Sequence, residues 1–340
     1  MKEKVLTVEN LSVRFRSEEG ETRAVRGVSF SLEQGETLAL VGESGCGKSA
    51  TAKALLGLLP ANAKVTSGKI FCGGRDVLTL SEKEFCALRG SRIAMVFQDP
   101  FSSLDPIVRV GKQLTEAMLI KNPVRKKQGL PIITKAEAKA RALQLMQEVG
   151  IDDVERRFKS YPFEFSGGMR QRIIIAIALA ADPEILVCDE PTTALDVRVQ
   201  AQILDLIKRL QKERNLSVIF ITHDLGVVAR IADRVAVMYA GKIVEYGKAQ
   251  EIFYGAKHPY TWALLSSSPP LTTEGRLPAI AGAPPSLSGE IKGDAFAPRN
   301  PYAMKIDFEC EPPFFKVSDT HYAATWLLHP YAPKVEKENE

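Results

Sequence analysis

Gly42-Glu43-Ser44-Gly45-Cys46-Gly47-Lys48-Ser49 is the stretch of sequence that decides the fold. It follows the apolar run 37–41 and precedes a segment, residues 48–58, with helical spacing. Glycines let a backbone wrap closely around phosphate groups, and the start of the following helix adds partial positive charge. The pattern GxxxxGK[ST] in this context predicts a phosphate-binding loop, in which Lys48 reaches the β- and γ-phosphates and Ser49 ligates Mg²⁺.

Two carboxylates, Asp189 and Glu190, follow a second apolar run at 185–188. Successive residues of a strand point to opposite faces, so one carboxylate can face Mg²⁺ while the other faces the attacking water. Such a pair seen alone is more often a solvated turn. Together with the phosphate loop, it favours Asp189 as a metal ligand and Glu190 as the general base.

A third polar stretch, Ser166-Gly167-Gly168, opens a helix predicted at about 168–181. Ser166 can cap this helix, and the two glycines leave its first amide groups exposed to a second anion. In isolation the stretch is better interpreted as an ordinary cap.

The remaining pattern alternates strands with helices, which predicts an α/β fold with a mostly parallel sheet. Short apolar runs and turns in residues 4–41 predict antiparallel strands, and 235–246 predicts a hairpin. Residues 99–165 predict an inserted helical subdomain with a loop at 121–135. Proline pairs after about residue 255 predict an irregular C-terminal extension, which we place at 255–333, before a disordered tail at 334–340.

The composition of the chain narrows the range of possible functions. The chain has 340 residues and a net charge of +4, which predicts no strong attraction to nucleic acid or anionic lipid. Its apolar runs fall short of the ~18–20 residues that span a bilayer, so we expect a soluble chain that reaches membranes through partners. The five scattered cysteines indicate reduced thiols. Lys48 and the helix start predict that one of them, Cys46, favours the thiolate and that ATP protects it from alkylation.

The order of these motifs resembles that of the ABC ATPases over about residues 4–250. Further stretches match the family's other motifs in family order: 95–100 (Q-loop), 165–171 (signature, with Phe165 where many members have leucine), 194–196 (D-loop) and 221–224 (switch histidine). The resemblance implies an ATP hydrolase with a RecA-like P-loop NTPase core, an antiparallel β subdomain and the helical subdomain, together spanning 1–254.

The resemblance also implies functional residues. In the family, two ATPase domains meet head to tail, and the signature of one binds the γ-phosphate held by the other. The expected nucleotide-binding residues are Phe15, Gly42, Ser44, Gly45, Cys46, Gly47, Lys48, Ser49, Ala50, Ser166, Gly167, Gly168 and Asp196. The expected ligands of Mg²⁺ are Ser49, Gln98 and Asp189. The expected catalytic residues are Glu190, His223, Gln98 and Lys48.

Details of sequence are similar to the peptide/nickel importer ATPases, particularly 99–106, 163–172, 257–261 and 280–285. The length of the extension fits the oligopeptide/dipeptide branch. This resemblance implies a peripheral subunit at the cytoplasmic face of the cell membrane. Its partners would be a second ABC ATPase, either a paralogue or the same chain, two transmembrane permeases that dock on residues 101–110, and indirectly an extracytoplasmic solute-binding protein. No nucleic-acid partner is expected.

Many relatives carry four cysteines in this extension, which hold an iron–sulfur cluster in some. The matching positions here fall near Asp294, Asn300, Cys310 and Thr325. One thiolate cannot hold a four-iron cluster, so we expect none. Packing, for instance by Trp262, Phe314, Phe315 and Trp326, must then order the extension.

Other functions stay open at this point. The same fold could serve an importer of another solute, such as nickel or a sugar. A soluble ABC ATPase that remodels nucleic acid or ribosomes should show a basic groove or coiled coil, and neither is evident. A GTPase should show an Asn-Lys-x-Asp motif, which the sequence lacks.

Overall fold

The computed structural model describes residues 3–18, 20–99, 102–127, 129–193, 195–267 and 280–335. The chain divides into two units, which are described separately. Unit 1 comprises residues 1–5, 33–35 and 77–220, and unit 2 comprises 6–32, 36–76 and 221–340. Part of the predicted tail, 336–340, lies outside the described residues.

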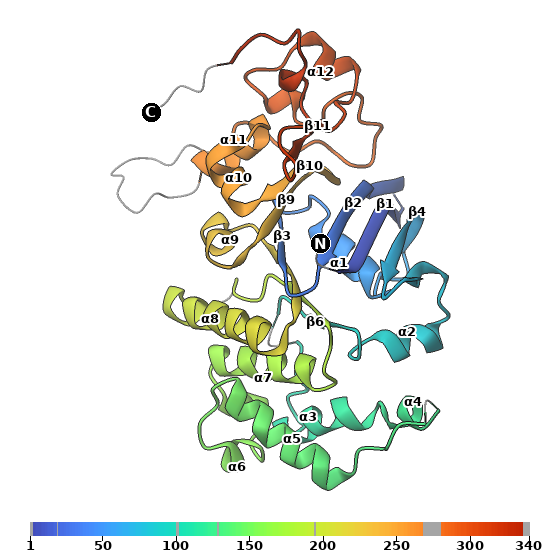
Figure 1. The fold of residues 1–340 in the computed structure, drawn as a ribbon, viewed down its shortest axis with the longest axis vertical. Coiled ribbons are helices and arrows are strands. Elements are labelled where there is room, and N and C mark those ends of the chain that lie inside the picture. The colour runs from blue at the N-terminus through green and yellow to red at the C-terminus, as the bar shows by residue number, and fades with distance from the viewer. Residues whose placement is uncertain are drawn as a thin grey trace. The chain divides into compact units, whose positions relative to one another are not determined.

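Unit 2 contains a four-stranded sheet near the N-terminus, drawn in blue in Figure 1. Its strand order is β2-β1-β4-β5, and β4 is antiparallel to both of its neighbours. The strands are β1 (Lys4–Ser17), β2 (Gly20–Glu33), β4 (Ala63–Cys72) and β5 (Arg75–Asp76). Leu6, Val8, Leu11 and Val13 of β1 are fully buried. The predicted antiparallel subdomain is confirmed.

A second run of hydrogen-bonded strands in unit 2 has the order β11-β12-β10-β9-β3. Its strands are β3 (Thr37–Val41), β9 (Arg234–Tyr239), β10 (Lys242–Lys248), β11 (Phe315–Lys316) and β12 (Tyr322–Ala323). β3 runs parallel to β9, whereas β9 and β10 form the predicted antiparallel hairpin. Ala240 and Gly241 both have positive φ, 45° and 82°, as a tight two-residue hairpin turn requires.

Helix α1 (Lys48–Leu55) follows β3 after the glycine loop. It ends three residues earlier than its predicted limit at residue 58. Gly57, with φ 60°, explains the early end, because a left-handed glycine just past a helix terminates it. Strand, glycine loop and helix therefore occur in the predicted order.

The C-terminal extension is more regular than its prolines predict. It contains helices α11 (Pro259–Ser266) and α12 (Lys305–Glu309), and α10 (Ala249–Gly255) ends where it begins. α10 and α11 are drawn beside β9 and β10 in Figure 1. Its strand β12 pairs with β10, placing Ala323 opposite Glu245. Side chains of the extension join the core cluster under β3 and β9, including Tyr260 and Phe296.

The aromatic residues expected to order the extension behave unequally. Trp262 Nε1 donates to the Ala256 carbonyl oxygen at 2.8 Å, and Trp326 Nε1 donates to that of Cys310 at 2.8 Å. Phe315 meets Trp326 edge-to-face, with ring centroids 6.1 Å apart. Phe314, in contrast, is 51% exposed, so its predicted packing role is wrong.

Unit 1 combines helices with the parallel strands β6 (Ile93–Val96) and β7 (Ile185–Asp189), and β7 lies between β6 and β8 (Ser217–Thr222). Its helices are α2 (Glu82–Leu88), α3 (Val110–Leu119), α4 (Asn122–Lys127), α5 (Lys135–Glu148), α6 (Val154–Arg157), α7 (Gly167–Leu179) and α8 (Val197–Arg214). α3, α5 and α7 contact one another. Mostly α/β structure with inserted helices agrees with the predicted fold class.

The predicted loop at 121–135 contains the short helix α4. Asn122 explains the difference, because its side chain closes this segment onto Ile133 through two hydrogen bonds of 2.8 Å, one to each backbone polar group. Pro123 then occupies a first-turn position, where proline is compatible with a helix.

None of the helices in the described part of the chain has both the length and the apolar character needed to cross a bilayer.

Candidate functional site

The phosphate loop joins buried β3 to α1, and its backbone demands glycine. Gly42, Gly45 and Gly47 have φ values of 149°, 78° and 105°. A Cβ atom at Gly42 would lie 2.1 Å from the carbonyl oxygen of Met238 on β9. At Gly42 a side chain is therefore excluded by the close approach of the neighbouring strand, whereas at Gly45 only backbone strain opposes one.

Lys48 lies inside this loop, with only 5% of the residue exposed. Its Nζ donates to the carbonyl oxygens of Gly42 and Glu43, at 2.7 and 2.9 Å. The amine thus holds the loop closed in the place predicted for a nucleotide phosphate. Ser49 and Ala50 are half-buried on the first turn of α1, and Ser44 is exposed.

The predicted thiolate at Cys46 is wrong. The side chain points into the loop interior, 4% exposed, and burial raises the pKa of the thiol although the nearby Lys48 lowers it. Loss of hydration opposes the charged form more strongly than one neighbouring cation favours it. Cys46 therefore lies in the loop as a neutral thiol.

In unit 1, adjacent parallel strands bring three predicted residues to one edge. Val96 of β6 pairs with Cys188 of β7, so Gln98 and Asp189 both follow at the same ends of these strands. Gln98 Nε2 donates to Glu190 Oε2 at 3.2 Å. Asp189 is buried, whereas Glu190 is half-buried.

Strand alternation does not place Glu190, contrary to the sequence argument. β7 ends at Asp189, and Glu190 has a left-handed backbone with φ 46°. That conformation is rare for a residue with a side chain and tends to persist at functional sites. Thr193 Oγ1 donates to Glu190 Oε2 at 2.9 Å, so the turn after β7 and Gln98 together orient this carboxylate.

Ser166 and the two following glycines begin α7. Ser166 Oγ accepts from the backbone N–H of Met169 at 3.3 Å, which makes it the cap that the sequence predicts. A Cβ atom at Gly168 would lie 2.5 Å from Val199 Cγ1 on α8. Packing of α7 against α8 therefore requires glycine there, independently of any ligand.

The other predicted residues are placed as follows. Asp196 caps α8, because its Oδ1 accepts from Val199 N–H at 3.0 Å. His223 is exposed directly after β8. Phe15 is half-buried on β1 opposite Ala63, a position equally suited to core packing and to adenine stacking. Phe15 and His223 belong to unit 2 with the phosphate loop, whereas Asp196 belongs to unit 1.

Sequence reasoning missed two residues that contact the loop, Arg299 and Tyr260. Arg299 pairs with Glu43, and the Tyr260 hydroxyl accepts from the Glu43 backbone N–H at 2.9 Å. Arg299 lies 256 residues from Glu43, so no local spacing signals the contact. Tyr260 lies in the stretch 257–261, which resembles the family without indicating a role.

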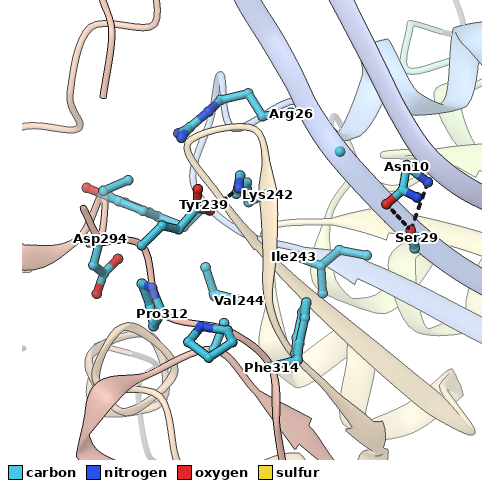
Figure 2. Close-up of a pocket in the computed structure, with 15 residues that line it drawn as sticks. Asn10, Arg26, Ser29, Tyr239, Lys242, Ile243, Val244, Asp294, Pro312 and Phe314 are labelled. Carbon is cyan, nitrogen blue, oxygen red and sulfur yellow. Dashed lines mark hydrogen bonds and ion pairs between the residues drawn. The ribbon is translucent and has the colours of Figure 1, made fainter. Parts of the chain in front are cut away.

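A separate cavity of about 400 Å³ lies within unit 2, as Figure 2 shows. Tyr239, Lys242, Asp294 and Phe314 are among its lining residues. Burial, then the neighbouring Arg26, lowers the pKa of Lys242 to about 8, and Lys242 pairs with Glu311 of the extension. The β9–β10 hairpin and the extension thus both contribute residues to the lining of this cavity.

Comparison with known proteins gives two family matches. Residues 25–193 match the family described as ABC transporter, and residues 244–306 match the oligopeptide/dipeptide transporter, C-terminal region. The chain is 56% identical over 334 residues to the dipeptide transport ATP-binding protein DppD of Lactococcus lactis subsp. cremoris, covering 98% of this chain and 93% of that protein. It is 56% identical over 336 residues to the oligopeptide transport ATP-binding protein OppD of Bacillus subtilis, covering 98% and 91%.

A solved structure supports the fold. The dimeric structure of MJ0796, a bacterial ABC transporter cassette, matches with a TM-score of 0.63 and 26% identity, covering 72% of this chain and 98% of that one. The loop, the paired carboxylates and these matches define an ABC-type ATPase, which binds and hydrolyses ATP. Within that class, the chain belongs to the family of ATP-binding subunits of oligopeptide/dipeptide ABC transporters. The predicted family and fold class are confirmed.

Proposed function

We propose that this chain supplies the energy for peptide import by hydrolysing ATP at the cytoplasmic face of the membrane. One observation carries the proposal. A single chain contains both the ABC transporter match and the oligopeptide/dipeptide C-terminal match, and it aligns over 98% of its length with peptide-transport ATPases. The second match favours peptides over nickel or sugar as the transported solute. We place the ATPase domain at 1–254 and the extension at 255–333.

Residue roles follow from the chemistry of each group. The glycine loop would wrap the triphosphate, and Lys48, now bonded to two loop carbonyls, would exchange them for phosphate oxygens. Phe15 would stack on adenine. Ser166 and Gly168 would bind the γ-phosphate of the opposite ATPase, with Asp196 at the same interface. Glu190 would act as general base, and His223 would contact the γ-phosphate.

The donor atoms in the proposed metal set fit Mg²⁺. Ser49, Gln98 and Asp189 offer a hydroxyl, an amide and a carboxylate oxygen, which are hard ligands. Mg²⁺ commonly takes only one or two carboxylates and completes its shell with water and substrate phosphates, so one buried carboxylate is enough. When bound, the ion would neutralise charge on the phosphates.

Orientation of Glu190 matters for hydrolysis. Thr193 and Gln98 both donate to the same oxygen, Oε2. The two bonds therefore hold the carboxylate in one orientation. Positioning and charge stabilisation, rather than covalent chemistry, would supply the rate enhancement.

Partners follow from the family. The chain would pair head to tail with a second ABC ATPase, preferably a paralogue, and bind two membrane permeases fed by a solute-binding protein. Of the proposed permease-docking segment 101–110, the described residues 102–110 include Ile107, which is strongly exposed. An exposed apolar side chain there suits docking of a short helix.

The variant Glu190→Gln tests the head-to-tail pairing of two ATPase domains directly. The amide keeps the shape and can still accept from Thr193, but it cannot accept the proton of a water. We expect the purified variant to shift from monomer to dimer in size exclusion when ATP-Mg is added. Glu190→Gln combined with Lys48→Ala is the control and should stay monomeric. A variant that binds no ATP would contradict the proposal. One that binds ATP yet stays monomeric would show that the dimer needs a different second ATPase or the membrane subunits.

A further inference from the structure

The C-terminal extension reaches the phosphate loop through an ion pair. Arg299 Nη1 and Nη2 donate to the two carboxylate oxygens of Glu43, at 2.6 and 3.0 Å. The arginine side chain is 4% exposed and the glutamate side chain 26%. A nearly buried pair with two parallel bonds is geometrically specific, unlike an ordinary surface pair.

Arg299 is itself fixed in place. Its Nε donates to the Ala281 carbonyl oxygen at 2.8 Å, and Nη1 also donates to Tyr239 Oη at 3.2 Å. The guanidinium lies over the rings of Tyr239 and Phe296, 5.7 and 5.9 Å from their centroids. These contacts hold the cation in one orientation before any ligand arrives.

Glu43 is held at its backbone as well. Its N–H donates to Tyr260 Oη, and Tyr260 is completely buried beneath the loop. The side chain and the main chain of one loop residue are therefore both fixed by the extension. Glu43 directly follows Gly42, where the backbone turns out of β3.

The negative charge of Glu43 indicates what this arrangement does. Glu43 places a carboxylate in a loop whose ligand is a highly charged anion. An unpaired carboxylate would repel that ligand at short range, where screening is weak. We propose that Arg299 is a positioning residue for nucleotide binding: it neutralises Glu43 and, together with Tyr260, holds the start of the phosphate loop in its binding geometry. The proposal rests on the ATP binding of this family.

The test compares variants of the full chain by calorimetric titration with ADP-Mg, which binds without turnover. Arg299→Gln should raise the Kd about tenfold, within the range of coupling between contacting charges. Glu43→Gln should bind ADP as tightly as the wild type or more tightly. The double variant should return to within about threefold of wild type, because the unpaired charge is gone.

A matched control comes from another ion pair of the extension. Lys242→Gln breaks the pair with Glu311, which involves neither Arg299 nor Glu43, and should leave the Kd unchanged. Tyr260→Phe should weaken binding by a smaller factor than Arg299→Gln, because it removes only the bond to the Glu43 backbone.

Three outcomes would overturn the inference. An unchanged Kd in Arg299→Gln would show that the pair does not act on the loop. A double variant as weak as the single one would assign Arg299 a purely structural role. Weaker binding in Glu43→Gln would do the same, and this variant remains informative even if Arg299→Gln fails to fold. A wild-type chain that binds no ADP would instead contradict the proposed function.

Discussion

Gly42 shows how closely the phosphate loop depends on single atoms. Gly42→Ala would place a Cβ atom 2.1 Å from the Met238 carbonyl oxygen, in a backbone conformation with φ 149°. We expect it to destabilise the chain by about 2–4 kcal/mol and to abolish detectable ADP binding, because backbone of either β9 or the loop must move. Urea unfolding and calorimetry measure the two effects.

Gly45→Ala is the matched control for this substitution. It lies in the same loop with φ 78°, but nothing lies within 4 Å of its Cβ position. Only backbone strain then remains, so we expect a loss of about 1 kcal/mol. Equal losses in the two variants would show that the contact with Met238 is unimportant.

The cysteines provide a second prediction at the scale of the residue. Cys86 and Cys310 are exposed, whereas Cys46, Cys72 and Cys188 are buried. Burial also raises the pKa values of Cys46 and Cys188. We expect a maleimide to modify Cys86 and Cys310 in the native chain, and the other three only after unfolding. Peptide mass spectrometry would detect this, and rapid labelling of Cys46 would contradict the buried, neutral thiol.

Sequence predicts the identity of the site residues better than their geometry. Spacing and residue type indicate Lys48, Asp189 and Glu190, because phosphate and Mg²⁺ chemistry restrict the choice of side chains. The left-handed turn at Glu190 was not predictable from the alternation of a strand, since the strand ends one residue earlier. The state of Cys46 was missed because burial, unlike a neighbouring lysine, leaves no local signal.

At the scale of the element, helix α11 begins at a titratable cap. His258 Nδ1 accepts from the Tyr260 N–H at 3.0 Å, and the residue is fully buried. Burial lowers the pKa of His258 from 6.5, although Asp294, Glu245 and Asp307 favour its charged form. The folded chain therefore binds fewer protons at this site than the unfolded chain. The contribution of the neutral His258 side chain to stability is thus lost as the pH falls below 6.5.

His258→Asn keeps a capping side chain but removes the titration. We expect its free energy of unfolding to fall less steeply than that of the wild type between pH 6.5 and 5. The difference in slope should be at most about 1.4 kcal/mol per pH unit. Urea unfolding at several pH values measures both slopes. Parallel curves would show that His258 does not contribute to the acid sensitivity.

Short elements of the extension were the least predictable. β11 and β12 have two residues each, which is too few for an alternation to be visible. β12 pairs with β10, which lies far away in the sequence, and β11 pairs with β12. The expectation of no iron–sulfur cluster stays a prediction. Three of the four positions that carry cysteine in many relatives are Asp294, Asn300 and Thr325 here. At each of them, the side chain accepts a hydrogen bond from the backbone N–H of the residue two positions later.

At the scale of the whole molecule, the extension shares a core with the β3 and β9 strands of unit 2. Phe296 is buried in the cluster that also contains Val41 and Tyr239. Phe296→Ala should therefore destabilise the chain by about 3–5 kcal/mol, because a large buried ring leaves a cavity. Phe314→Ala is the control, since that ring is half exposed. Similar unfolding midpoints in the two variants would show that the extension folds independently of the core.

The distance along the chain between Glu43 and Arg299 has a consequence during synthesis. The two residues are 256 positions apart, so the glutamate leaves the ribosome long before its partner. At ~5–20 residues per second, the interval is about 10–50 seconds. Throughout that time the nascent loop carries an uncompensated negative charge and repels nucleotide. A chain cut short by a premature stop or a protease would keep this defect, so incomplete copies would consume little ATP.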